Sequence, residues 1–168
     1  MCGRPRRPTI SRHYRQPERE DHRKRGSRGY DAGKKINGRK RHILVDMFGF
    51  LLAVAVHPAN VQDKSGGALL LERCAKCFSR LQVIFADGAY VGPTMQAACA
   101  DHHGSRLEVV KRNELHRFEV LPKRWIVERT LAWLGRNRRL SKDYEELIEM
   151  SEAFVLLAMI RLIAGRLA

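Results

Sequence analysis

Two adjacent apolar runs constrain the fold of this chain more than any other feature. The first covers residues 42–49 and ends in Gly49, and the second follows at once as Phe50-Leu-Leu-Ala-Val-Ala-Val56. Two runs of strand-forming residues joined at a glycine predict an antiparallel hairpin. Their nearly continuous apolar character indicates that the hairpin is buried on both faces. The chain must therefore build a sheet that other elements cover.

The segments that follow alternate between helical and strand patterns. We expect a helix over 65–80 after a polar capping segment at 60–64, a strand over 81–86, a helix over 93–101, a strand over 107–111, an ambiguous segment at 118–121, and helices over 122–136 and 142–167. Alternation after an initial hairpin predicts an α/β domain with a mixed sheet flanked by helices.

Residues 1–28 differ in composition from residues 29–168. Arg, Pro, His and Glu dominate this first segment, and Ile10 and Tyr14 are nearly its only large apolar residues. Such a composition predicts disorder. A basic tail that follows a DNA backbone and a segment without an evolved role both fit. We therefore divide the chain into a disordered basic tail, 1–28, and a folded domain, 29–168.

The net charge of +14 favours a polyanionic partner, because each phosphate that a protein neutralises releases condensed counterions. A ribosome-like structural protein or a membrane-surface binder would also be basic. The longest apolar run, 154–160, is too short to span a bilayer, and no secretion signal is visible. We expect a cytoplasmic protein with reduced thiols. Cys74 and Cys77 have zinc-like spacing, but without a second pair we expect both to face the core from a helix.

Two carboxylates are candidates for metal or ligand binding. Glu128 stands among basic residues on the helix over 122–136, whose buried stripe we expect to be Trp125, Ile126, Leu131 and Leu134. It is either an ion-paired surface residue or a metal ligand beside cations that bind phosphate. Asp87 directly follows the strand over 81–86. It either forms an Asp-Gly turn or belongs to a ligand site at the carboxyl end of the strand.

Four motifs resemble the DDE transposases of bacterial insertion sequences, above all the branch numbered as the fifth family. They are Gly29-Tyr-Asp-Ala-Gly-Lys-Lys35, Gly38-Arg-Lys-Arg-His42, Ala86-Asp-Gly-Ala-Tyr-Val-Gly92 and Arg124-Trp-Ile-Val-Glu-Arg-Thr-Leu-Ala-Trp-Leu-Gly-Arg136. The resemblance covers about residues 28–146. It implies a ribonuclease-H-like fold, a site for two Mg²⁺ ions, and cutting and joining of double-stranded DNA at terminal inverted repeats and a target.

The resemblance also implies roles for single residues. Asp87 and Glu128 correspond to the second and third metal-binding carboxylates, and Arg124 to the arginine one helical turn before the third. Two Mg²⁺ ions held by such carboxylates activate the nucleophile and stabilise the leaving oxygen. The chain departs from the family's Y-R-E-K signature at two positions. Leu121 replaces the tyrosine, and Gly135 replaces the lysine with Arg136 beside it.

The first aspartate of the family is missing here. The family carries it on the opening strand, in a motif like Ile-Asp-Ser-Gln-Ser-Val-Lys before the Gly29 segment, and this chain has no such motif. Asp46 matches another family position, and we expect it to have a structural role near the hairpin turn. The resemblance thus implies a partial catalytic domain that lacks the first strand and one metal carboxylate.

A frame shift would explain this gap. Residues 13–23, back-translated with free codon choice and read one base later, permit Ile-Ile-Asp-Ser-Gln-Ser-Val-Lys-Thr-Thr-Glu, in which the aspartate codon overlaps that of Arg15. We hypothesise that residues 1 to about 27 are an out-of-frame translation. The coding DNA tests this hypothesis, which fails if its shifted reading does not yield the motif.

Basic side chains form two further candidates for DNA contact. They are a cluster before the first intact strand (Lys34, Lys35, Arg39, Lys40 and Arg41) and a group beyond the Glu128 helix (Arg136, Arg138 and Arg139). Such residues either position DNA through its phosphates or form a solvated edge. Trp125 and Trp133 either stack on a base or, as we expect, pack in the core. We derive no role for the polar segment His57, Asn60, Gln62 and Asp63.

Two functions remain open. The first is a metal-dependent transposase, or a weakly active or inactive remnant of one, associated with the bacterial nucleoid. The second is a DNA-binding fragment without catalysis that inhibits the full-length transposase. The final helix, with Leu147, Phe154, Leu157 and Ile160, either packs on its own domain or pairs with a second protomer in a homodimer.

Overall fold

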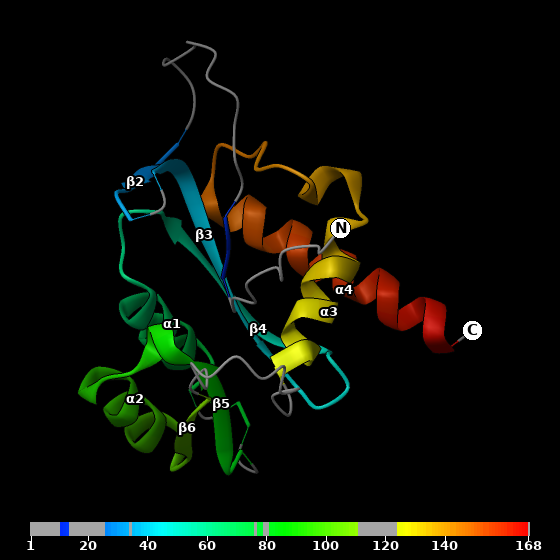
Figure 1. Cartoon of the computed structure of the whole chain (residues 1–168). Helices are drawn as coiled ribbons and strands as arrows, with labels where there is room; N and C mark the ends of the chain where they lie inside the picture. Colours follow the sequence, from blue (N-terminus) through cyan, green and yellow to red (C-terminus); the bar gives the residue numbers. More distant parts are fainter. Residues whose placement is uncertain are drawn as a thin grey trace, which may run out of the picture.

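The computed structural model describes residues 11–13, 26–33, 35–75, 77–78, 81–110 and 124–167. The elements in chain order are β1 (Ser11–His13), β2 (Gly29–Asp31), β3 (Ile36–Val45), β4 (Leu51–Pro58), α1 (Asp63–Arg73), β5 (Val83–Asp87), the 3-10 turn η1 (Gly88–Tyr90), α2 (Pro93–His103), β6 (Arg106–Val110), α3 (Arg124–Gly135), the 3-10 turn η2 (Arg138–Leu140) and α4 (Ile148–Leu167) (Figure 1). The alternation of strands and helices is confirmed from β3 onward. The ambiguous segment 118–121 lies outside the described residues.

Strands β3 and β4 form the predicted hairpin. They pair antiparallel from Arg39 opposite Pro58 to Val45 opposite Leu51, with a bulge after Leu44. The turn is closed by Asp46, whose Oδ1 accepts the backbone N–H groups of Phe48 at 2.9 Å and Phe50 at 2.8 Å. The expected structural role of Asp46 is therefore confirmed.

The strands form two small sheets, and the expectation of one mixed sheet is corrected. In the first sheet β3 lies between β1 and β2 in the order β1-β3-β2 and also pairs with β4, and all three pairings are antiparallel. In the second, β5 and β6 pair parallel from Val83 opposite Arg106 to Asp87 opposite Val110. No ladder between described strands joins the two sheets. The described part of the chain is thus a mixed α/β structure with four α-helices and two sheets.

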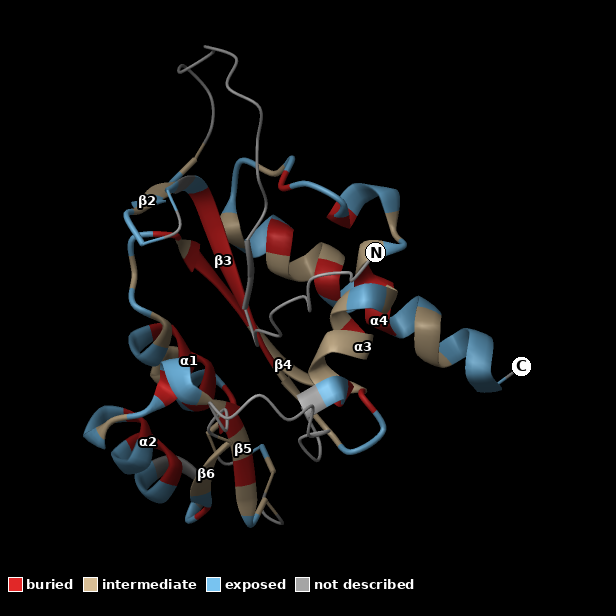
Figure 2. Ribbon diagram, viewed as in Figure 1, coloured by how far each residue is buried: buried red, intermediate tan, exposed pale blue. Residues whose placement is uncertain are grey.

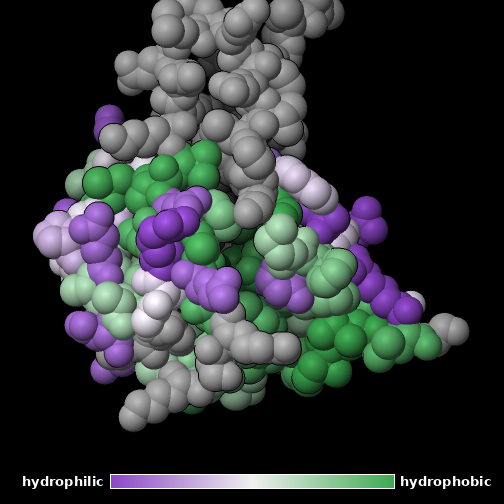
Figure 3. Space-filling model, turned by 90° about the horizontal axis from the view of Figure 1, so that it is seen from below, coloured by the Kyte–Doolittle hydropathy of each residue, from purple (hydrophilic) through white to green (hydrophobic). Residues whose placement is uncertain are grey.

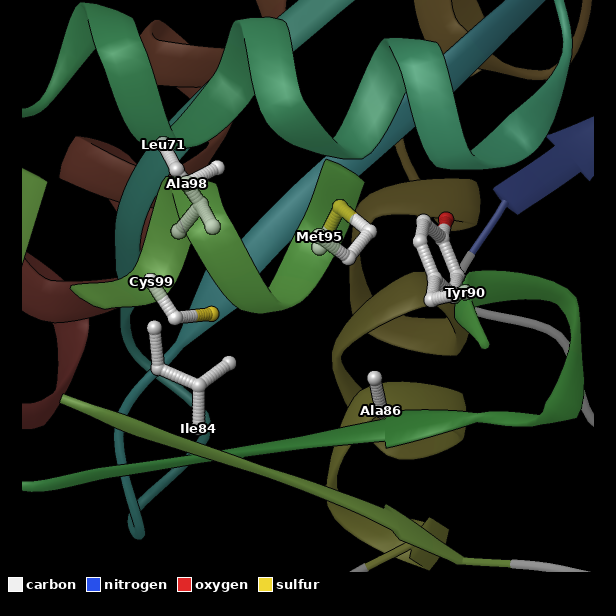
Figure 4. Close-up of a cluster of buried hydrophobic side chains, with 7 residues drawn as sticks. All are labelled: Leu71, Ile84, Ala86, Tyr90, Met95, Ala98 and Cys99. Carbon is white, nitrogen blue, oxygen red and sulfur yellow. The ribbon is translucent and has the colours of Figure 1, made fainter. Parts of the chain in front are cut away.

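Two hydrophobic clusters form the core. The first lies between α1, α2 and β5 and contains Leu71, Ile84, Ala86, Tyr90, Met95, Ala98 and Cys99 (Figure 4). The second lies where α4 covers β4 and η2, and contains Leu134, Leu140, Val155, Ala158 and Met159. The hairpin runs between these two clusters, and residues 38–43 of β3 and 55–57 of β4 are buried (Figure 2). The hairpin therefore links the two halves of the molecule.

Several element boundaries differ from the sequence-based expectation. Helix α1 ends at Arg73, so Cys74 is buried at its C-cap whereas Cys77 is exposed, and only one of the two cysteines faces the core. Helix α4 begins at Ile148 rather than near 142, because η2 and the loop after it precede the helix. No described helix is long and apolar enough to cross a membrane.

Candidate active site

Asp87 stands at the carboxyl end of β5. Its Oδ1 accepts the backbone N–H of Ala89 at 2.9 Å, which caps η1. The carboxylate is half-buried, and the described residues give its second oxygen no hydrogen bond. The residue therefore forms the expected turn and still presents an oxygen at the end of the strand.

Glu128 is a half-buried residue of α3, a helix that contacts both β3 and β5. Two residues hold α3 on the β3–β4 turn. The buried Thr130 hydroxyl donates to the Gly49 carbonyl at 2.8 Å, and Arg129 donates to the Phe48 carbonyl at 2.7 Å. Gly49 permits this approach, because its φ is +85° and a Cβ atom there would lie 2.7 Å from Thr130 Oγ1. Glu128 and Asp87 thus come from two elements that touch.

Arg124 is the first residue of α3, one turn before Glu128. The same helix buries Ile126, Thr130 and Leu134 on one stripe. The expectation that Trp125 and Leu131 belong to that stripe is corrected, since Leu131 is half-buried and Trp125 is 48% exposed. The helix therefore has a narrower buried face than its apolar residues suggested.

The exposed side of α3 carries alternating rings and guanidinium groups. Arg129 lies 4.3 Å from the Trp125 ring and 4.6 Å from the Trp133 ring. Arg166 of α4 lies 4.1 Å from the Trp133 ring. Cation–π contacts thus hold these indoles at the surface. The expectation that Trp125 packs in the core is wrong for this reason.

A metal site needs more donors than these two carboxylates. Their oxygens are of the hard type that Mg²⁺ prefers. No group of three or more His, Cys, Asp or Glu side chains that could hold a metal ion is found among the described residues. The donor type therefore fits a divalent ion, whereas the number of donors does not.

Three of the five residues of the first basic cluster lie on β3 and are buried there. This corrects the expectation that these three face solvent. Arg39, Lys40 and Arg41 are 3%, 5% and 5% exposed. Because side chains alternate along a strand, Arg39 and Arg41 share one face with Asp143. Asp143 Oδ2 lies 3.3 Å from Arg39 Nη1, and its Oδ1 lies 3.9 Å from Arg41 Nη2. Lys40 Nζ lies on the other face, 3.1 Å from Asp31 and 3.0 Å from Asp63.

Backbone carbonyls complete this network of buried charges. Arg39 donates to the carbonyls of Ser27, Glu145 and Glu146, and Arg41 donates to that of Leu140. Unpaired buried charges are strongly unfavourable, so these contacts fix the loop after η2 against β3. The remaining basic candidates, Lys35, Arg136, Arg138 and Arg139, are exposed, and Lys34 lies outside the described residues. Contact of any of these residues with DNA stays a prediction.

Two buried histidines, His42 of β3 and His57 of β4, lie beside Lys40. The rings of His42 and His57 stack with centroids 4.6 Å apart, and His42 Nδ1 lies 2.6 Å from the Tyr90 hydroxyl. His57 Nδ1 donates to the Pro58 carbonyl at 2.9 Å, and burial lowers the pKa of His57 below its usual 6.5. Gly66 of α1 lies against both rings, where any Cβ atom would overlap them. The pair was missed in the sequence because one histidine comes from each strand.

Comparisons with known proteins give the family of this chain. The family model "Transposase DDE domain" matches residues 8–163. The chain is 32% identical over 125 residues to a protein of Burkholderia cepacia that is named as the transposase of insertion sequence element IS402. The aligned part is 70% of this chain and 59% of that protein, so the chain spans about three fifths of its relative. No solved structure matches the chain significantly. The extent of the family match shows that this chain belongs to the transposase DDE domain family.

Proposed function

We propose that this chain is part of the catalytic domain of an insertion-sequence transposase, with weak or no cleavage activity of its own. The observation that carries this proposal is the contact between β5, which ends in Asp87, and α3, which bears Glu128. The substrate is double-stranded DNA at insertion-sequence ends, together with target DNA. The net charge of +14 supports a phosphate-rich substrate.

In this proposal Asp87 and Glu128 bind divalent metal through their carboxylate oxygens. When bound, Mg²⁺ would activate the attacking oxygen and stabilise the leaving one. Arg124 begins the helix that carries Glu128 and would contact a DNA phosphate near the metal. Two carboxylates hold a pair of ions poorly, because each ion takes several oxygen ligands. Cleavage is therefore slow or absent.

We also propose that the domain is ribonuclease-H-like, with the three-residue β1 in place of the full opening strand that the resemblance implies. The separation of the described strands into two sheets supports this view. Strand β1 pairs antiparallel with β3, from Ser11 opposite His42 to His13 opposite Lys40. A longer strand in this position, paired with β5 on its other edge, would join the two sheets. The hypothetical out-of-frame aspartate overlaps Arg15, two residues beyond β1.

The frame-shift hypothesis stays a proposal that the coding DNA decides. The family match begins at residue 8, within the segment that we expect to be out of frame. This start does not support a frame shift, so the hypothesis depends on the reading of residues 13–23 alone. A coding sequence whose shifted frame lacks the Ile-Asp-Ser-Gln motif would reject it.

The proposed function is tested with the purified chain, Mg²⁺ and DNA that carries the terminal repeats. We expect a gel shift with this DNA, and cleavage far below that of a full-length transposase of the same element. Glu128→Gln should preserve the gel shift and remove any residual cleavage. Cleavage at the full-length rate would show that another carboxylate replaces the missing aspartate. Failure to bind the DNA at all would refute the proposal.

A second candidate function is inhibition of the full-length transposase. The feature that favours it is the combination of a strongly basic chain with an incomplete carboxylate set. Adding this chain to a reaction of the full-length enzyme distinguishes the two candidates. An inhibitor lowers the yield of strand transfer in proportion to its concentration, and Glu128→Gln inhibits equally well.

A further inference from the structure

Helix α4 has two apolar faces, and its own domain covers only one of them. Ser151, Val155, Ala158 and Met159 are buried against the body of the molecule. On another side of the helix, Met150, Leu157, Ile160 and Leu167 are 45%, 57%, 60% and 84% exposed. Figure 3 shows apolar side chains along one side of the projecting end of α4 and hydrophilic ones on the other.

The uncovered residues follow a heptad pattern. Positions 150, 153, 157, 160, 164 and 167 are separated by alternate steps of three and four, and they hold Met, Ala, Leu, Ile, Ala and Leu. Ala153 is half-buried and Ala164 is exposed. Apolar residues at this spacing form the seam between paired helices. We call these six positions the α4 seam, and it is about 26 Å long at 1.5 Å per residue.

We propose that a second copy of this chain covers the α4 seam, with the two α4 helices antiparallel. The seam is complementary to itself in that orientation. Met150 then lies opposite Leu167, Leu157 opposite Ile160, and Ala153 opposite Ala164, so large residues meet large ones and small meet small. This arrangement is an isologous interface with a two-fold axis between Leu157 and Ile160.

The shape of the molecule favours the antiparallel orientation. The first half of α4 lies on β4, and its buried residues end at Met159, whereas residues 164–167 are all exposed. This exposed end extends beyond the body (Figures 1 and 2). In an antiparallel pair the projecting end of each helix lies along the first turns of the other. A parallel pair would instead bring the two bodies together at one end of the seam.

Electrostatics favours the same orientation. The first turn of α4 carries Glu149, and its last turn carries Arg166, whose guanidinium also lies 4.1 Å from the Trp133 ring of its own chain. An antiparallel pair brings each acidic first turn near the basic last turn of the partner, and it opposes the two helix dipoles. A parallel pair brings like charges together at both ends.

The mass of the chain in solution, measured by light scattering without DNA, tests this proposal. We expect twice the 19.3 kDa monomer mass at micromolar concentration. Leu157→Glu combined with Ile160→Glu should give a monomer with unchanged circular dichroism, because both side chains are already exposed. Phe48→Glu is the matched control, because Phe48 is 70% exposed on the β3–β4 turn and is not part of the α4 seam. This variant should stay dimeric. A monomeric wild type, or a double variant that remains dimeric, would overturn the proposal.

A second experiment tests the orientation in a background of Cys2→Ser and Cys77→Ser. In that background, Met150→Cys combined with Leu167→Cys should give a covalent dimer with a short bismaleimide cross-linker. Met150→Cys alone should not, because the two copies of residue 150 lie about 26 Å apart at opposite ends of an antiparallel seam. Efficient cross-linking through Met150→Cys alone would show parallel helices and overturn the antiparallel arrangement.

Discussion

The buried ion pairs around Asp143 allow a prediction of stability with a worked magnitude. The carboxylate lies between two guanidinium groups, and the side chains of Asp143, Arg39 and Arg41 are 7%, 1% and 6% exposed. Its Oδ1 also accepts the Ser151 hydroxyl at 3.2 Å. Asp143→Asn removes the carboxylate that forms ion pairs with both cations on this face of β3, and its amide N–H₂ group adds a donor where acceptors are needed.

Removing one partner of a buried pair costs about 3–5 kcal/mol, because the remaining charge stays desolvated. Net stabilities of single domains are about 5–15 kcal/mol, so Asp143→Asn should lose a large part of the folding free energy. Urea unfolding followed by circular dichroism measures the change as a lower midpoint at constant slope.

Two variants control this experiment. Glu145→Gln breaks the ion pair with Arg139, whose side chain is 58% exposed, and should leave the urea midpoint nearly unchanged. Arg39→Met combined with Asp143→Asn should cost less than the sum of the two single changes, because the two side chains are coupled. A loss below about 1 kcal/mol for Asp143→Asn would refute the account of β3 as a strand whose charges are buried and paired.

Three further predictions concern other parts of the fold. Gly66→Ala should lower the thermal midpoint by an amount that corresponds to about 1–3 kcal/mol, because its methyl group would overlap the rings of His42 and His57. Since burial lowers the pKa of His57, the unfolded chain binds the proton more readily, and the free energy of unfolding should decrease as the pH falls below 6.5. His57→Leu should flatten this dependence in urea unfolding at several pH values, and an unchanged slope would contradict the assignment. Thr130→Val should cost about 1–3 kcal/mol in the same assay, because it leaves the Gly49 carbonyl without its 2.8 Å hydrogen bond; a neutral result would show that α3 is held by its other contacts.

Local patterns predicted the elements well. Short stretches of sequence were enough to predict the hairpin, α2, α3, β5 and β6, because apolar runs, Gly49 and Pro93 mark them locally. The positions of Asp87 at a strand end and of Glu128 on a helix follow from the same patterns. These features depend on neighbouring residues, which a sequence displays directly.

The errors concern contacts between distant parts of the chain. Arg39 and Arg41 look like an exposed basic cluster, and their burial depends on Asp143, which lies about a hundred residues later. Trp125 looks like a core residue, and it lies at the surface because Arg129 covers its ring. The division into two sheets also depends on which strands lie side by side. Periodicity in the sequence carries no information about such pairings.

The central claim is that a transposase-family chain retains two of its metal carboxylates and lacks the first. A strand-transfer assay with Mg²⁺ and terminal-repeat DNA tests it most directly, by comparing this chain with a version whose opening segment, residues 13–23, is replaced by the shifted-frame reading. The account predicts background activity for this chain, clear activity for the restored chain, and loss of that activity on Glu128→Gln. Equal activity of the two chains, or a restored chain that Glu128→Gln does not affect, would contradict it.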